Sequence, residues 1–352
     1  MSEQDNKAQS EEQARERISD LRKIELSINQ WVESLLTGDR LSLAKGITLL
    51  ESTRIEDHEK STLLLNALLP HTGKSWRIGI TGVPGVGKST LIEQLGLNFI
   101  QNGHKVAVLA IDPSSRLSAG SILGDKTRMN ELAVNDSAFI RPSPASDSLG
   151  GVARMTRESM MLCEAAGYDI IIVETVGVGQ SETEVHDMVD TFLLLMLAGA
   201  GDELQGIKRG IMEMADVIAV TKADTENLQR AQQARTSISS AIHLFAGNEE
   251  QWVVPVITCS TVNEDGINEL LHKVESHRIH IESAGFKTER RKKQNLFWFK
   301  KSLEEQIIHD ILNKEDLINE IEQQKIAILQ NKISPFTAAN ELVKRIKMKY
   351  FN

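Results

Sequence analysis

Short apolar runs alternate with helix-like stretches through the middle of the chain, between Arg77 and about Ile281. The runs read RIGIT, KVAVLAI, AFIRP, YDIIIVE, TFLLLML, VIAVT and VPVIT. Continuous apolar runs are typical of parallel strands buried on both faces, and their alternation with helices is typical of an α/β sheet. We therefore expect an α/β domain in which a mostly parallel sheet is flanked by helices.

Helical spacing dominates on either side of this domain. From about Ser19 to Leu69 the apolar residues recur at helical intervals, as in LSLAKGITLLES, and after KTERRKKQN the chain turns helical to its end. In SPFTAANELVKRIKMKY, Ser334 is expected to cap a helix whose first residue is Pro335. The expected organisation is a disordered polar tail at 1–18, an N-terminal helical region at 19–72, the α/β domain at 73–285 and a C-terminal helical arm at 286–352.

Composition narrows the class of protein. The net charge of −9 argues against general neutralisation of nucleic-acid phosphates, so we expect no nucleic-acid partner. Two cysteines, Cys163 and Cys259, are too few for a disulfide framework. The first residues, MSEQDNKAQSEEQARERISD, carry no apolar signal segment, and the longest apolar run, TFLLLMLAGAG, is too short to cross a bilayer. We expect a cytoplasmic protein without a membrane partner.

The stretch TGVPGVGKST fits the phosphate-binding pattern G-x-x-x-x-G-K-[ST] and lies between a predicted strand and a predicted helix. Its glycines let the backbone curl so that successive N–H groups point at phosphate oxygens, and the helix start adds its positive end. The lysine is expected to neutralise the β and γ phosphates, and the serine hydroxyl to bind Mg²⁺. The nucleotide-binding residues expected here are Gly82, Val83, Pro84, Gly85, Val86, Gly87, Lys88, Ser89 and Thr90.

A second motif selects the base. VIAVTKAD places Thr221, Lys222 and Asp224 at the end of a buried strand, where GTPases carry an N/T-K-x-D element. The aspartate would accept hydrogen bonds from the ring N–H and the exocyclic amine of guanine, while adenine would leave it unpaired, a discrimination of roughly ten-thousand-fold. Lys222 would pack its stem over the base. In TCSTVNEDGINEL, Ser260 and Thr261 would offer backbone N–H groups to the guanine carbonyl.

Acidic residues follow two further predicted strands. Asp112 ends KVAVLAID, Glu174 ends YDIIIVE, and Asp125 lies in the polar loop ILGDKTRM. Doubly wound sheets place ligands at the carboxyl ends of their strands. Carboxylates there can hold Mg²⁺ directly or through its waters, so these three acids and Ser89 form the expected metal site.

Taken together, several segments make the chain similar to the MeaB/ArgK family of P-loop GTPases. They are TGVPGVGKST, IDPSS, GSILGDKTRM, FIRPSP, LGGVA, ETVGVGQSE, AGAGDELQGIKRGIMEMAD and TKAD, and the similarity runs from the helix GITLLES through the C-terminal arm. The resemblance implies a GTPase domain of the signal-recognition/MinD-like class that binds GTP or GDP with Mg²⁺. It also implies a homodimer formed through the arm. Such proteins are chaperones of adenosylcobalamin-dependent acyl-CoA mutases, chiefly methylmalonyl-CoA mutase, in which GTP hydrolysis gates cofactor transfer and protects the mutase from inactivation.

The resemblance also implies roles for single residues. Lys88 and Ser89 match the P-loop, Asp112 and Asp125 match the switch I acids near Mg²⁺, and Glu174 matches the acid that heads switch II. Lys88, Asp112 and Glu174 are therefore expected to take part in catalysis.

Three further positions match the family, and two depart from it. Asp202 and Lys208, in GDELQGIKRG, match a mobile third switch that reports the nucleotide state, and they are also expected to serve catalysis. Asp224 matches the guanine-specifying aspartate. Thr221 stands where asparagine is usual and can make one bond to the P-loop, which predicts modestly weaker nucleotide binding. Thr261 replaces the usual alanine and keeps the backbone donor.

No glutamine or histidine is clearly placed to orient the attacking water, since Gln180 is not positioned relative to Gly177 as in the small signalling GTPases. Slow intrinsic hydrolysis accelerated by a partner is therefore expected. The alternative function is a small-molecule kinase of amino-acid transport type, which would need a second substrate pocket, and no signature of one is found. A membrane-targeting GTPase would need an apolar or Met-rich partner-binding segment, which is absent from the sequence.

Two other features are interpreted structurally. His272, His277 and His280 share one predicted helix, but His277 lies off the stripe of the other two, so the pattern does not favour a metal site. The run ERRKKQ is short and borders the arm, which favours a solvated linker.

Three consecutive aromatic residues, Phe297, Trp298 and Phe299, lie in the arm. Consecutive positions point to different faces of a helix, so they predict a helix buried on more than one side. The Ile/Leu-rich pattern that follows, up to Leu329, is too apolar to stand alone in water, which predicts that the arm after Lys293 makes the homodimer.

Overall fold

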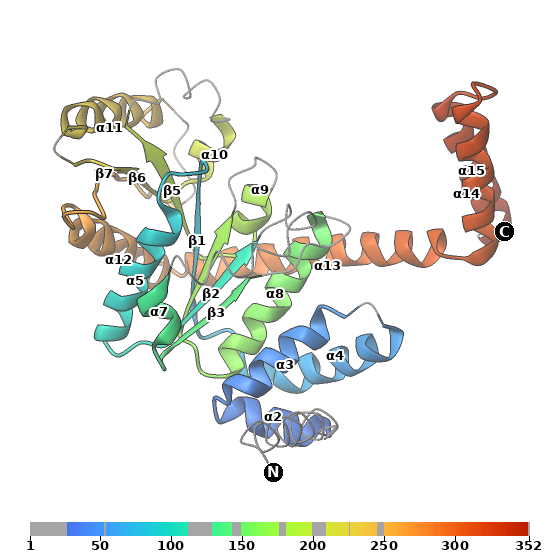
Figure 1. Ribbon diagram of the computed structural model, residues 1–352, viewed down its shortest axis with the longest axis horizontal. Coiled ribbons are helices and arrows are strands. Elements are labelled where there is room, and N and C mark those ends of the chain that lie inside the picture. Colours follow the sequence, from blue (N-terminus) through green and yellow to red (C-terminus); the bar gives the residue numbers. More distant parts are fainter. Residues whose placement is uncertain are drawn as a thin grey trace, which may run out of the picture. The chain divides into compact units, whose positions relative to one another are not determined.

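The computed structural model describes residues 27–52, 54–111, 129–142, 149–175, 181–198, 209–224, 226–244 and 250–350 (Figure 1). The chain divides into two compact units, Met1–Lys287 and Thr288–Asn352. The predicted boundary between residues 285 and 286 lies two residues before this division. The predicted tail at 1–18 lies outside the described residues.

The first unit is built on a parallel sheet of seven strands in the order β3-β2-β4-β1-β5-β6-β7. All six pairs of neighbouring strands are parallel. The seven apolar runs of the sequence correspond to these strands, so the predicted parallel sheet is confirmed. The strands are β1 (Trp76–Gly82), β2 (Val106–Ile111), β3 (Ala138–Pro142), β4 (Ile170–Thr175), β5 (Thr191–Leu197), β6 (Val217–Thr221) and β7 (Val256–Thr258).

Helices cover both faces of this sheet (Figure 1). Along β5, Leu193 and Leu195 pack into an apolar cluster with residues of α5 and α12, whereas Leu194 and Met196 pack into another with residues of α10 and α11. This alternation follows from the two-residue period of a strand and explains why the runs are apolar throughout. The helices are α5 (Lys88–Gln101), α7 (Asn130–Val134), α8 (Leu149–Ala165), α9 (Ser181–His186), α10 (Arg209–Met214), α11 (Leu228–Ile242) and α12 (Ile267–Ser283).

The N-terminal helices pack on the outer side of α8, as Figure 1 shows. Gly46 permits a close approach there, because a Cβ at this position would lie 2.6 Å from Cδ2 of Leu162 on α8. The predicted helical region is thus confirmed over its described part. Its elements are α2 (Ile28–Leu36), α3 (Arg40–Leu50), α4 (Ile55–Leu68) and the 3₁₀ turn η1 (Leu69–His71).

The second unit is helical, as predicted. It contains most of α13 (Phe286–Leu312), together with α14 (Glu315–Leu329) and α15 (Pro335–Tyr350), which pack against each other. Ser334 caps α15 as expected, since its Oγ accepts a hydrogen bond from the Thr337 N–H at 3.1 Å. No helix in the described part of the chain combines the length and the apolar composition that a membrane span requires.

An ion pair joins α14 and α15. The Lys349 ammonium donates a hydrogen bond to the Asp316 carboxylate, and the Tyr350 hydroxyl donates to the same group at 2.9 Å. These two bonds lower the pKa of Asp316 to about 2. The hairpin is therefore fastened near the start of α14 and the end of α15.

The basic run ERRKKQ is helical and belongs to α13, so its interpretation as a linker is wrong. Arg, Lys, Glu and Gln are good helix formers, and Lys292 pairs with Glu289 one turn away at 2.7 Å. The helix therefore runs without a break across the boundary between the two units.

The aromatic cluster is buried on one side only. Trp298 is 4% exposed, whereas Phe297 and Phe299 are 44% and 68% exposed. In the single chain, two large apolar side chains of α13 therefore face outward, and burial of the helix on more than one side stays a prediction for the homodimer.

Candidate nucleotide site

The P-loop has the backbone shape that phosphate binding requires. It follows β1 and opens α5, the strand–loop–helix context that the sequence predicts. Gly82 has φ +152°, and a Cβ there would lie 2.5 Å from the carbonyl oxygen of Leu195 on β5. Gly87 caps α5 in the left-handed conformation with φ +98°. Both positions therefore require glycine.

The lysine of the motif lies over this loop. The Lys88 side chain is largely buried, and its Nζ donates to the carbonyl oxygen of Gly82 at 2.8 Å, with that of Val83 at 3.3 Å. The ammonium and the amino end of α5 thus place positive charge at the same point, which suits an anion. The other loop residues are mixed in exposure: Val86 is buried, while Pro84, Gly85 and Thr90 are exposed.

The structure brings two of the predicted metal ligands together. The Ser89 hydroxyl donates to Oε1 of Glu174 at 3.2 Å, and both residues are buried. The contact follows from strand register, because β1 and β4 are neighbours and Ile80 lies opposite Glu174. A hydroxyl and a carboxylate at one point are the oxygen donors that Mg²⁺ prefers, so the pair fits this ion.

Thr221 joins the base-recognition loop to the P-loop. It is the last residue of β6 and is 3% exposed. Its hydroxyl donates to the carbonyl oxygen of Val86 at 2.7 Å and lies 3.3 Å from that of Met196. The bond that the sequence expects from threonine at this position is therefore present. Lys222, next in the chain, has φ +56° and turns the backbone sharply.

The last loop is attached to the base-recognition loop and to α5. The Ala223 N–H donates to the carbonyl oxygen of Cys259 at 3.1 Å, and the Gln94 side-chain amide of α5 donates to that of Thr261 at 2.9 Å. Asp224 follows in this arrangement and is half-buried. Hydrogen bonds thus gather three loops that are far apart in sequence.

The two backbone donors predicted in this last loop are Ser260 and Thr261. The Ser260 N–H donates to the carbonyl oxygen of Asp265 at 2.9 Å, so of the two we expect Thr261 to supply the guanine contact. The thiol of the neighbouring Cys259 is expected to be unreactive, because burial raises its pKa to about 12.

Four predicted site residues lie outside the described part of the chain. They are Asp112, Asp125, Asp202 and Lys208. Gln180, considered for water orientation, also lies outside it. The described elements nearest to the third switch are β5, which ends at Leu197, and α10, which begins at Arg209.

Sequence reasoning missed the role of Gln94 in this site. Gln94 belongs to α5 and lies more than one helical turn after the P-loop motif. No rule of residue spacing predicts its contact with Thr261. The predicted residues that the described structure brings together are Lys88 with Gly82 and Val83, Ser89 with Glu174, and Thr221 with Val86.

A parallel α/β sheet with a P-loop after β1 and a TKAD loop fastened to it defines a P-loop nucleoside triphosphatase. Comparison with known proteins makes the class specific. The family model described as Methylmalonyl Co-A mutase-associated GTPase MeaB matches residues 43–316. The chain belongs to this family of GTPases, and the resemblance seen in the sequence is confirmed.

Individual relatives agree with the family. GTPase ArgK of Escherichia coli strain K12 is 44% identical over 328 residues, which cover 93% of this chain and 99% of that protein. The mitochondrial methylmalonic aciduria type A homolog of Mus musculus is 40% identical over 92% of this chain and 80% of its own length. The crystal structure of an LAO/AO transport system kinase matches with a TM-score of 0.72 and 38% identity, over 91% of this chain and 97% of that one.

Proposed function

We propose that this protein is a GTP-hydrolysing chaperone of an adenosylcobalamin-dependent acyl-CoA mutase, and that its partner is methylmalonyl-CoA mutase. The family match across residues 43–316 carries the proposal, because it spans the nucleotide loops and the start of the arm. A mouse relative named for methylmalonic aciduria supports the same partner. GTP hydrolysis would gate loading of the cofactor and protect the mutase, with the protein acting in the cytoplasm.

In this proposal the described loops hold the nucleotide. Lys88 neutralises the β and γ phosphates while the loop N–H groups and the start of α5 surround them. Asp224 accepts two hydrogen bonds from guanine, Lys222 covers the base, and the Thr261 N–H donates to the guanine carbonyl. The Thr221–Val86 bond of 2.7 Å supports this assignment, because it fixes the base loop relative to the phosphate loop.

Magnesium belongs to the same proposal. Ser89 and Glu174, 3.2 Å apart, would hold the ion directly or through its waters, with Asp112 and Asp125 as further ligands. When bound, Mg²⁺ would neutralise charge that develops on the phosphates during transfer to water. The residues of the chain orient the nucleotide, and slow intrinsic turnover would rise when the mutase completes the site.

The third switch would carry the signal to the partner. Asp202 and Lys208 belong to GAGDELQGIKRG, a glycine-punctuated segment between β5 and α10. Glycines on both sides permit a change of backbone conformation. A charged pair there could form contacts in one nucleotide state and break them in the other.

The helical arm would make a homodimer. Large apolar side chains along its helices are exposed in the single chain, and patches of this kind mark interaction surfaces. A partner arm that covers them would remove apolar area from water, which is the main favourable term in association. Those that are at least 42% exposed on α13 are Leu296, Phe297, Phe299, Leu303, Ile307, Ile308 and Leu312.

The protective function can be tested by following mutase activity during turnover in the presence of adenosylcobalamin. We expect mutase inactivation to slow when this chain and GTP are both present, and to proceed at the unprotected rate with Lys88→Ala. Equal inactivation with the parent, the variant and no added chain would contradict the proposal. The kinase alternative is separated by tracing the γ-phosphate of labelled GTP, which should appear only as inorganic phosphate when amino acids are supplied.

A further inference from the structure

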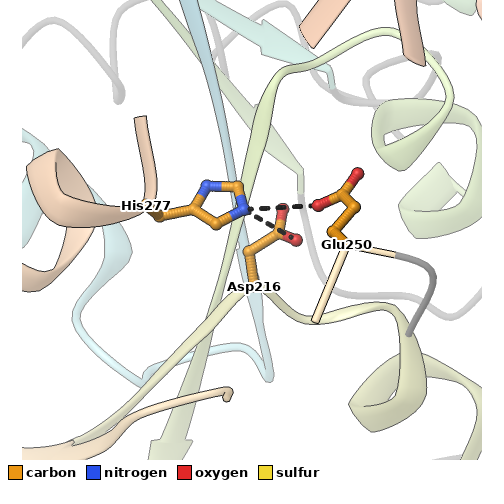
Figure 2. Close-up of side chains that lie close together, drawn as sticks. All are labelled: Asp216, Glu250 and His277. Carbon is orange, nitrogen blue, oxygen red and sulfur yellow. Dashed lines mark ion pairs between the residues drawn. The ribbon is translucent and has the colours of Figure 1, made fainter. Parts of the chain in front are cut away.

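A buried histidine faces two carboxylates (Figure 2). The cluster lies near the start of β6, whereas the nucleotide loops follow the ends of the strands. His277 of α12 directs Nε2 toward Oδ1 of Asp216 at 3.3 Å and toward Oε2 of Glu250 at 3.9 Å. Asp216 directly precedes β6, whose far end is Thr221 in the nucleotide site. Five residues of extended strand separate the two positions by about 16 Å. The cluster is therefore distinct from the Mg²⁺ site.

We propose that Asp216, Glu250 and His277 bind one divalent transition-metal ion of the Zn²⁺ type. The three ligand atoms lie within 4.8 Å of one another and offer one nitrogen and two oxygens. Zn²⁺ binds such donors at about 2.0–2.2 Å, and tetrahedral geometry then separates neighbouring ligand atoms by about 3.4 Å. The distance of 3.3 Å between His277 and Asp216 already matches this edge.

Glu250 completes the set with a small adjustment. Its side chain is 14% exposed, against 0% for His277 and 6% for Asp216, so it forms the rim of the cluster. Its 3.9 Å distance to Nε2 must shorten by about half an ångström to reach the tetrahedral edge. Rotation about the bonds of a glutamate side chain supplies such a movement. The fourth position of the ion would be left to water on the rim side.

A relay of hydrogen bonds orients the imidazole for this role. Nδ1 of His277 lies 3.0 Å from Oγ1 of Thr191, which also accepts from Nε1 of Trp76 at 3.0 Å. A hydroxyl oxygen has two acceptor lone pairs, so it can accept from both Trp76 and a protonated Nδ1. With the proton on Nδ1, the lone pair of Nε2 faces the two carboxylates. Metal-binding histidines are typically held in this way through their other ring nitrogen.

Hydrogen bonds also fix the position of Asp216. Its Oδ2 accepts the Phe192 N–H at 2.8 Å, and its carbonyl oxygen accepts Nε1 of Trp252 at 2.8 Å. These two bonds leave Oδ1 directed at His277. The backbone at Glu250 is fixed as well, because its carbonyl oxygen lies 2.7 Å from Nε2 of His280. Hydrogen bonds thus hold the His277 ring, the Asp216 carboxylate and the backbone of Glu250 in place.

The charges of the three groups favour a divalent cation. Two carboxylates and a neutral imidazole sum to −2, which an M²⁺ ion neutralises. The ion would join α12, the start of β6 and the segment before β7 at the side of the sheet remote from the nucleotide, so its role would be structural.

Zn²⁺ binding by the full-length, chelator-treated, nucleotide-free protein tests this proposal. We expect one equivalent to bind and to raise the Tm by at least about 3 °C when free Zn²⁺ exceeds its Kd a hundredfold. Co²⁺ should give the visible bands of a four-coordinate ion. Glu250→Gln, at the rim, should weaken Zn²⁺ binding at least tenfold and remove these bands. Glu269→Gln, an exposed position of α12, is the matched control and should bind as the parent does.

Two results would overturn the assignment. The first is a parent protein whose Tm and Co²⁺ spectrum do not respond to the metal, which would leave the cluster as an ion pair of protonated His277 with its carboxylates. The second is equal Zn²⁺ affinity in the parent and in Glu250→Gln, which would place the ion elsewhere. Asp216→Asn, which keeps an acceptor for the Phe192 N–H, provides an independent variant with the same expected loss.

Discussion

Replacing Thr221 by valine tests how the nucleotide site is held together. The substitution keeps the branched shape of a side chain that is 3% exposed and removes only its hydroxyl. That hydroxyl donates to the Val86 carbonyl oxygen at 2.7 Å, and it is the direct side-chain bond from the base loop to the P-loop. The change therefore removes the hydrogen bond between the two loops without creating a cavity.

The magnitude follows from the burial of this bond. A neutral intramolecular hydrogen bond contributes about 1 kcal/mol net, and a buried acceptor left unsatisfied costs about 1–3 kcal/mol. The carbonyl of Met196, 3.3 Å from the same hydroxyl, loses a weaker contact. We expect Thr221→Val to lower the free energy of unfolding by about 1–2 kcal/mol. If organisation of the P-loop accounts for a similar amount, the Kd for GDP rises by about 5–30-fold.

Titration with a fluorescent GDP analogue at fixed Mg²⁺ measures this loss, and urea unfolding measures the stability. Thr236→Val is the control, because that hydroxyl also donates to a backbone carbonyl, at 3.0 Å, but on the exposed face of α11. Thr221→Asn restores the residue usual at this position and should tighten binding. A Thr221→Val protein that binds GDP within twofold of the parent would refute the idea that the hydroxyl organises the site.

Four further outcomes follow from the same account. Lys88→Ala should abolish GTP hydrolysis while the chain stays folded; unchanged turnover would contradict the phosphate role of the lysine. Asp224→Asn should weaken GTP binding strongly and favour xanthosine nucleotides in competition assays, whereas equal competition by ATP in the parent would rule out guanine specificity. A chain truncated near Arg290 should be monomeric by light scattering and the full chain dimeric at tens of micromolar, about the range in which a stable interface holds; a monomeric full chain would exclude the dimer. Cys163 and Cys259 are buried with raised pKa values, so neither should react with a thiol reagent before denaturant is added, and rapid labelling of the native protein would contradict this.

The sheet could be predicted because parallel strands that are buried on both faces appear in the sequence as apolar runs. Every residue of β1, β2, β4 and β6 is buried, so each appears as a mainly apolar run, with Arg77 in β1 and Glu174 in β4 as the charged exceptions. Local rules also sufficed at the start of α15, where Ser334 and Pro335 form a helix start whose geometry depends only on neighbouring residues.

The basic run of α13 shows where such rules fail. Its charges indicate a solvated surface, but a solvated surface is compatible with both a linker and a helix. Helix propensity and the Glu289–Lys292 pair favour the helix, and for this run propensity is a better guide than charge.

The contacts of the nucleotide site depend on strand register, which the sequence does not state. Ser89 meets Glu174 because β4 lies beside β1 with Ile80 opposite Glu174. The motif identifies the two residues as candidates, and only the sheet order brings them together. The commitment of the Ser260 N–H to Asp265 likewise depends on how the last loop closes.

The sequence contains only part of the information that predicts the cluster of Asp216, Glu250 and His277. His277 lies three residues after Val274 and four before Ile281, both buried, so helical periodicity places it on the core side of α12. The same offset separates His277 from His272 and His280 on the helix. Its carboxylate neighbours come from distant parts of the chain and follow no spacing rule.

A nucleotide site that serves a cobalamin mutase should respond to that partner, so GTP turnover with and without the mutase is the decisive measurement. Purified chain should release phosphate slowly alone and much faster when a cobalamin mutase from the same genome is added. Lys208→Ala should retain basal turnover and GTP affinity within a few-fold, on the order of 1 kcal/mol or less, but lose most of the stimulation. If the mutase stimulates Lys208→Ala as strongly as the parent, the third switch does not relay the nucleotide state to the mutase. A parent chain that no mutase stimulates would contradict the chaperone function itself.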